Sequence, residues 1–160
     1  MRLQRGEVPV FLDENHYRFE LGRAKVLNSN GGDVLIVSLG LMTRHALSAL
    51  VDLDKEGIRA TLIHVSTLKP LDEELILEHV ERIPFVVSCE NHTVIGGLGS
   101  ALAEAVTSAG IPMTLRRVGV QDVYATCGST AYLFKKHGLD STAIVSETKE
   151  LLRASTRLVR

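Results

Sequence analysis

Residues 34–65 decide the fold class, and they read VLIVSLGLMTRHALSALVDLDKEGIRATLIHV. Residues 34–39 are almost all apolar and are followed by Gly40, a pattern typical of a strand that is covered on both faces. A second apolar run at residues 60–65 predicts another strand of the same kind. Because about twenty residues separate the two runs, we expect them to pair in parallel through a crossover.

The residues between these two runs have the pattern of an amphipathic helix. Apolar side chains recur with a 3.6-residue period from Ala46 to Leu53, and Thr43 is the predicted N-cap. Gly57 stands where a residue with a left-handed backbone ends a helix. This order of strand, helix and strand predicts a parallel pair joined by a right-handed crossover.

The same alternation continues to the end of the chain. Further strands are predicted at residues 85–89 and 114–118, and further helices after Asp72, after the glycine-rich segment 96–100, after Ser129 and at 142–154. Strands that alternate with helices at this spacing place helices on both faces of one sheet. We therefore expect a three-layer α/β/α domain with a mostly parallel sheet of about five strands.

Length and composition narrow the class of protein. The 160 residues match one domain, and 45% of them are hydrophobic, as in an ordinary globular protein. The net charge of −1 offers no positive field for a phosphate backbone, so nucleic acid is not an expected partner. No apolar run approaches the ~20 residues that span a bilayer, so a membrane is not expected either.

The two cysteines and the first residues complete this description. Cys89 and Cys127 are far apart in the chain, which indicates reduced thiols and a cytoplasmic protein. Residues 1–31 are polar and loop-like, and we interpret them as a lead-in that lies outside the core. Residues 32–160 are the predicted domain.

The segment Gly96-Gly97-Leu98-Gly99-Ser100 opens a helix directly after a strand. Free backbone N–H groups at such a helix start are able to cradle an anion. The segment is neither a complete dinucleotide-binding G-x-G-x-x-G nor a phosphate-binding P-loop, because the sixth-position glycine and the Lys-Ser/Thr pair are missing. These gaps favour a second interpretation, in which small residues let the helix approach the sheet or another subunit closely.

Glu90 and His92 follow the same strand at its carboxyl end, where open α/β sheets bind ligands. Two residues apart in an extended chain, they share one face and are conceivable as an acid/base pair. As ligands of a zinc ion, Glu90 and His92 would form an incomplete site, because a third and a fourth ligand are missing. The favoured interpretation is a hydrogen-bonding pair that anchors a loop or a subunit contact. From its residues alone, the chain has no complete active site and no metal site.

Six motifs follow one another in a recognisable order. They are DVLIVSLG at 33–40, LKPLD at 68–72, SCENH at 88–92, GGLGS at 96–100, VGVQD at 118–122 and Gly138-Leu139. In this order, over residues 20–154 and without a large insertion, the chain resembles the C-terminal domain of transketolase-type enzymes. The segments Arg2–Gly6 and Phe19–Ala24 are similar to the exit from the preceding pyrimidine-binding domain and to the entry into the C-terminal domain.

The resemblance implies a part of an enzyme that is inactive alone. In such enzymes thiamine diphosphate and magnesium lie between two domains that are missing here, so we expect no catalytic, cofactor or metal residue in this chain. The thiamine-binding domains are the implied partners, in the same chain or in a separate subunit, and a homo-oligomer is expected. Arg5 matches the arginine that contacts the substrate phosphate, and a guanidinium pairs bidentately with phosphate.

Three alternatives stay open beside a split transketolase. Deoxyxylulose phosphate synthase shares Lys-Pro-Leu-Asp and the Gly-Leu-Asp at residues 138–140. The beta subunits of 2-oxo acid dehydrogenase complexes share the order of motifs. The third alternative is a stand-alone α/β module that binds an anion at the start of the helix after residue 97. The segment Tyr124–Cys127 departs from the aromatic–Gly pair common in split transketolases.

Overall fold

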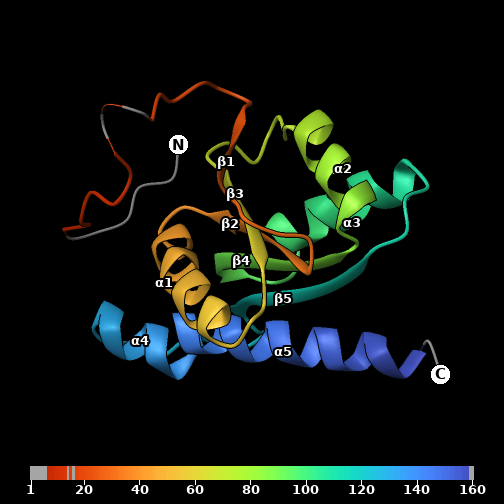
Figure 1. The fold of residues 1–160 in the computed structure, drawn as a ribbon. Coiled ribbons are helices and arrows are strands. Elements are labelled where there is room, and N and C mark those ends of the chain that lie inside the picture. Colours follow the sequence, from red (N-terminus) through yellow and green to blue (C-terminus); the bar gives the residue numbers. More distant parts are fainter. Residues whose placement is uncertain (1–6, 14, 16, 159–160) are drawn as a thin grey trace.

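The computed structural model describes residues 7–13, 15 and 17–158, and they form one sheet between two layers of helices (Figure 1). This confirms the three-layer α/β/α prediction. In chain order the elements are β1 (Ala24–Ser29), β2 (Val34–Leu39), α1 (Met42–Lys55), β3 (Ala60–Val65), α2 (Glu73–Arg82), β4 (Phe85–Thr93), α3 (Leu98–Ser108), β5 (Thr114–Val120), α4 (Thr130–Lys136) and α5 (Ser141–Leu158).

The sheet has five strands in the order β1-β3-β2-β4-β5. The pairs β3–β2, β2–β4 and β4–β5 are parallel, and β1 alone runs antiparallel, next to β3. The chain reverses its direction of growth at β2, because β3 lies on one side of it and β4 on the other. Open α/β sheets bind ligands outside the carboxyl ends of their strands at such a switch point.

The central strand β2 shows why an unbroken apolar run predicts a doubly covered strand. Val34 and Ile36 are fully buried in the cluster that packs against α1 and α5. Leu35 and Val37, which point to the other face, are fully buried in the cluster under α2 and α3. Because successive side chains of a strand alternate between faces, both faces of β2 need apolar residues.

Two predicted helix caps are confirmed. The carboxylate of Asp72 accepts a hydrogen bond from the backbone N–H of Leu75 at 3.5 Å, and Ser129 Oγ accepts one from the N–H of Tyr132 at 3.3 Å. Asp72 also accepts the N–H of Ala24 at 2.9 Å. That bond ties the first residue of β1 to the start of α2.

The lead-in interpretation of residues 1–31 is wrong for residues 24–29. These residues form β1, pair with β3 and place Ala24 in the core cluster under α2. The sequence AKVLNS is half-exposed, as an edge strand requires, so it lacks the apolar run that identified the other strands. The further idea that the earlier residues belong to another domain stays a prediction.

The carboxyl ends of β2, β3, β4 and β5 lie at one edge of the sheet, called here the carboxyl edge. The segment before β1 lies at the same edge, because Ala24 pairs with Val65 at the end of β3. Figure 1 shows that segment, the start of α1 and α4 on the same side of the sheet. A binding site formed by the segment before β1, the start of α1 and α4 would therefore lie at the carboxyl edge.

Candidate functional site

The glycine-rich turn between β4 and α3 is organised around the side chain of Glu90. The Glu90 carboxylate is fully buried, and its two oxygens accept hydrogen bonds from the backbone N–H groups of Leu98, at 2.8 Å, and Gly99, at 3.0 Å. A carboxylate at this position meets the positive end of the helix dipole and pairs two N–H groups that have no partner within the helix. Glu90 therefore holds the first turn of α3 against the end of β4.

This arrangement decides between the two interpretations of the glycine-rich turn. The N–H groups of Leu98 and Gly99, which an external anion would use, already bind the chain's own carboxylate. The N–H of Gly96 is also taken, because it donates to Ser100 Oγ at 2.9 Å. These backbone N–H groups at the start of α3 are therefore bound to side chains of the same chain. The alternative of a stand-alone anion-binding module depended on their being free.

The glycines provide the close approach that the second interpretation expected. A Cβ atom at Gly97 would overlap Oε2 of Glu90, and one at Gly99 would lie 2.8 Å from Ser88 Oγ. Side chains at either position would push α3 away from β4. The close approach of the helix to the sheet is thus confirmed, with Glu90 as the group that needs the space.

Glu90 and His92 do not form a pair. His92 is exposed, and its Nδ1 lies 3.1 Å from the carbonyl oxygen of Thr93, whereas Glu90 points into the core under α3. The register of β4 against β5 shifts between Cys89 and Thr93, so simple alternation does not hold there. Glu90 is hydrogen-bonded to the turn after β4, and the structure does not assemble it with His92 as an acid/base pair.

Two further predictions concern a substrate contact at Arg5 and the metal ligands. Arg5 and its neighbour Arg2 lie outside the described residues, so the substrate-phosphate contact stays a prediction. Among the described residues, no group of three or more His, Cys, Asp or Glu side chains is placed to hold a metal ion.

A buried polar network at the ends of β2 and β3 was missed from the sequence. Thr43 Oγ1 lies 2.8 Å from Ser38 Oγ and 2.8 Å from His64 Nδ1, and all three side chains are buried. The predicted role of Thr43 as N-cap of α1 is wrong, because the helix begins at Met42 and Thr43 turns inward to His64. The available signal was a Ser and a His inside otherwise apolar strand segments.

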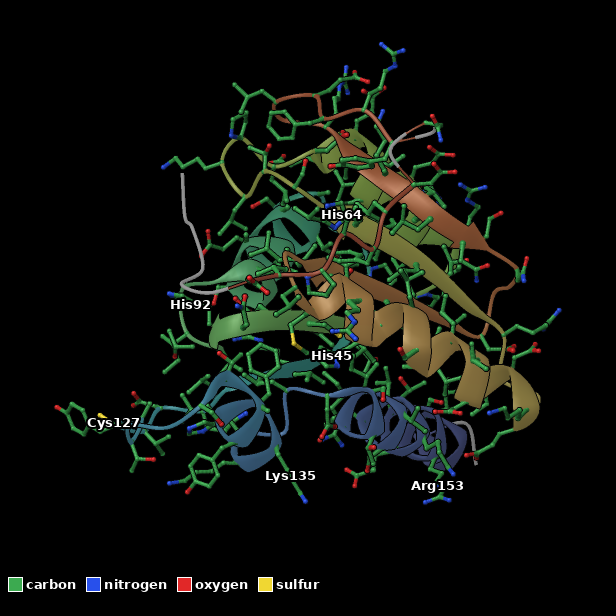
Figure 2. All side chains as sticks on the ribbon, turned by 90° about the vertical axis from the view of Figure 1, so that its left-hand side faces the viewer. His45, His64, His92, Cys127, Lys135 and Arg153 are labelled. Carbon is green, nitrogen blue, oxygen red and sulfur yellow. The ribbon has the colours of Figure 1, made fainter. Side chains whose placement is uncertain are left out.

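His64 also joins this network to the segment before β1. The ring of Tyr17 meets the His64 ring edge-on, with centroids 5.7 Å apart. Burial lowers the pKa of His64 from its usual 6.5 to about 4, so the imidazole is neutral at physiological pH. A neutral ring suits its contacts with a hydroxyl and an aromatic ring. Figure 2 labels His64 at the carboxyl edge of the sheet, together with His92 from β4 and Cys127 from the segment after β5.

The two cysteines have contrasting environments. Cys89 is fully buried, and burial together with the nearby Glu90 carboxylate raises the pKa of its thiol. Cys127 is exposed in the segment between β5 and α4. Neither is in a disulfide in the structure.

In the part of the chain that the structure describes, no helix is both long and apolar enough to cross a membrane.

Comparison with known proteins gives consistent matches. The family model described as "Transketolase, C-terminal domain" matches residues 22–144. A transketolase family protein of Sinorhizobium fredii is 47% identical over 154 residues, which are 95% of this chain and 44% of that protein. A 1-deoxy-D-xylulose-5-phosphate synthase of Heliobacterium modesticaldum is 36% identical over 164 residues, covering 99% of this chain and 25% of that enzyme.

One solved structure is similar along nearly the whole chain. It is a split-gene transketolase described as an inactive beta4 tetramer, with a TM-score of 0.84 and 41% sequence identity. The match covers 93% of this chain and 48% of the other. The chain therefore spans less than half the length of these similar proteins.

Proposed function

Since the chain belongs to the family of the transketolase C-terminal domain, we propose that it is the C-terminal part of a thiamine-diphosphate-dependent transketolase. That enzyme transfers two-carbon ketol units between sugar phosphates. In it, this part is a scaffold for assembly and holds none of the reacting atoms. The chain alone is inactive, and the complete enzyme is a homo-oligomer in the cytoplasm.

This proposal rests on one observation, the fraction of each relative's length that the chain covers. The match to the Sinorhizobium fredii protein takes in 95% of this chain but 44% of the relative. The relative therefore carries more than half of its length in addition to the matched part. In our proposal that additional length belongs to the thiamine-binding part of the enzyme. For the present chain, the thiamine-binding domains are in the same polypeptide or in a separate subunit.

The described residues do not fit thiamine diphosphate or magnesium. Magnesium takes oxygen ligands from carboxylates and amides, and no cluster of such acidic side chains is present among the described residues. A diphosphate would need free N–H groups at a helix start, and those of Leu98 and Gly99 are bound to Glu90. We therefore assign both groups to the partner domains and derive no chemical step through them here.

Arg5 is the single substrate contact in this proposal. Its assignment rests on the family resemblance of the segment around it and on the bidentate geometry that a guanidinium offers a phosphate. Replacing Arg5 by Lys keeps the charge but removes the fork. In the complete enzyme we expect Arg5→Lys to raise the KM for sugar phosphates more than it lowers kcat.

Two measurements test the proposal. Mixing the chain with the thiamine-binding domains of the same enzyme is expected to produce ketol transfer that neither part shows alone. The melting temperature of the isolated chain is expected to be unchanged by millimolar thiamine diphosphate and magnesium, because a ligand that binds the native state raises it. Absence of transfer in the mixture would contradict the assembly. A reproducible rise of several degrees would place a cofactor site in this chain.

A second candidate is the C-terminal domain of a 1-deoxy-D-xylulose-5-phosphate synthase. The match to the Heliobacterium modesticaldum enzyme, which covers 99% of this chain, supports it. The assembled enzyme distinguishes the two candidates by its product. Formation of 1-deoxy-D-xylulose 5-phosphate, without ketol transfer between sugar phosphates, would favour the second.

A further inference from the structure

Exposed apolar side chains are concentrated in three segments of the chain. Among the described residues, ten large hydrophobic side chains are exposed, and only Val26 and Val51 lie outside these segments. Tyr124 is fully exposed, and residues 121–132 are exposed without interruption. The eight side chains in the three segments are Val8, Val10, Phe19, Leu21, Ile95, Val123, Tyr124 and Tyr132.

The three segments all lie at the carboxyl edge of the sheet. The first holds the described residues between 7 and 22, and the N–H of Gly22 donates to Thr67 Oγ1, just after β3, at 3.1 Å. The second, residues 93–97, starts at the last residue of β4, and the third, residues 121–132, follows β5 and includes the start of α4. The N–H of Val94 donates to the carbonyl oxygen of Val120 at 2.9 Å, so the second and third segments are neighbours. We call these three segments together the carboxyl-edge surface.

Specific bonds fix the backbone that presents the apolar side chains. Glu90 holds the start of α3 beside the turn that carries Ile95. Arg117 Nη1 donates to the carbonyl oxygen of Val94 at 3.2 Å. In the third segment, Lys136 Nζ donates to Thr126 Oγ1 at 3.0 Å and lies 5.8 Å from the centre of the Tyr132 ring. A surface that is already ordered loses less entropy on binding than a loose one.

The size and composition of this surface suit a protein partner. The three segments contain about thirty described residues, close to the 20–30 residues that each partner contributes to an interface of standard size. Tyrosine is enriched in interface cores, and exposed apolar side chains that gather on one side of a protein are typical of interaction sites.

We infer that the carboxyl-edge surface is the face on which the thiamine-binding domains of the same enzyme dock. This inference rests on the proposed function and adds to it the surface and its anchors. The occupant follows from length, because the relatives carry more than half of their chain outside the matched part. Tyr124 and Ile95 are the expected anchors, since each places a large apolar side chain in solvent.

The test measures binding of the full chain to the thiamine-binding domains of the same enzyme, produced as a separate polypeptide. Calorimetry gives the Kd for the unchanged chain and for Tyr124→Asp and Ile95→Asp. We expect each substitution to raise the Kd at least about tenfold, because a charge in the core of an interface is desolvated without a partner. Because both side chains are exposed, the melting temperature of the free chain is expected to stay within about 2 °C.

Val51→Asp is the matched control. Val51 is 57% exposed on α1, outside the carboxyl-edge surface, so its Kd is expected to stay within about twofold of the unchanged chain. If the complex forms and transfers ketol groups but Tyr124→Asp and Ile95→Asp bind normally, the inference is wrong and the proposed function stands. If the unchanged chain neither binds the domains nor supports transfer, the proposed function fails as well.

A second copy of the chain is the other possible occupant, and sedimentation velocity of the chain alone tests it. The inference predicts that Tyr124→Asp leaves the sedimentation coefficient of the free chain unchanged. A dimer that Tyr124→Asp converts to monomer, with unchanged affinity for the thiamine-binding domains, would assign the surface to the second copy and overturn the inference.

Discussion

Replacing Glu90 by Gln is expected to destabilise the domain strongly, although the two side chains have nearly the same shape. The buried carboxylate accepts two backbone hydrogen bonds, from Leu98 at 2.8 Å and from Gly99 at 3.0 Å. The amide of Gln keeps one oxygen acceptor, and its NH₂ group then faces the second N–H. That N–H is left buried without a partner.

The magnitude follows from these two bonds. A hydrogen bond to a charged acceptor contributes about 1.5–3 kcal/mol, and a buried N–H without a partner costs about 1–3 kcal/mol. We therefore expect Glu90→Gln to lower the free energy of unfolding by roughly 2–4 kcal/mol, allowing for the weakened neutral bond that remains. For a domain of this length, that loss lowers the melting temperature by roughly 4–16 °C.

Urea unfolding followed by circular dichroism measures this change, with the m-value held as a check on two-state behaviour. Glu104→Gln is the matched control, because Glu104 is an exposed carboxylate on the same helix, α3. It is expected to change the free energy of unfolding by no more than about 0.5 kcal/mol. A loss below about 1 kcal/mol for Glu90→Gln, or one equal to that of Glu104→Gln, would refute the capping role derived from these two bonds.

Three other predictions follow from the same region of the molecule. Gly97→Ala is expected to lower the free energy of unfolding by about 1–3 kcal/mol in urea, because the added Cβ overlaps Glu90 Oε2, whereas Gly32→Ala, which meets open space, is expected to be neutral. His64 has a pKa of about 4 when folded and its usual 6.5 when unfolded, so the unfolded chain binds more protons between these values. This difference contributes up to about 3 kcal/mol to the free energy of unfolding, a contribution that is complete above pH 6.5 and lost as pH falls to about 4. Unfolding curves of His64→Gln, measured over this pH range, are expected to lack this part of the pH dependence. With a thiol-reactive dye, the exposed Cys127 is expected to react in the folded protein, and the buried Cys89, whose pKa is raised, only after unfolding; two fast-reacting thiols would contradict this.

Local patterns in the sequence determined the layers of the fold. The apolar run of β2 and the periodic apolar positions of α1 each require burial on particular faces, and a sheet covered by helices on both sides is what satisfies both. The caps at Asp72 and Ser129 were also predictable, since a cap and the N–H groups it binds are only three residues apart. The order of motifs was enough to predict the family.

Contacts between distant residues were decided only by the tertiary structure. Thr43 had the residue type of a cap, but a hydrogen bond to His64, on a different strand, takes its hydroxyl inward. The strand β1 has no apolar run because it lies at an edge, where half of its side chains meet water. For Thr43 the available signal was the polar Ser38 and His64 inside otherwise apolar strands, whereas β1 has no signal in the nearby sequence.

The candidate site divides in the same way. The sequence alone indicated that Glu90 and the glycines of the following turn matter, because they stand where a strand ends and a helix begins. It left the partner of Glu90 open, since Leu98 and Gly99 are eight and nine residues away and the intervening turn sets where their N–H groups point. The carboxyl-edge surface needed the tertiary structure entirely, because residues as far apart in the chain as Phe19 and Tyr124 reach one edge only when the parallel strands are aligned.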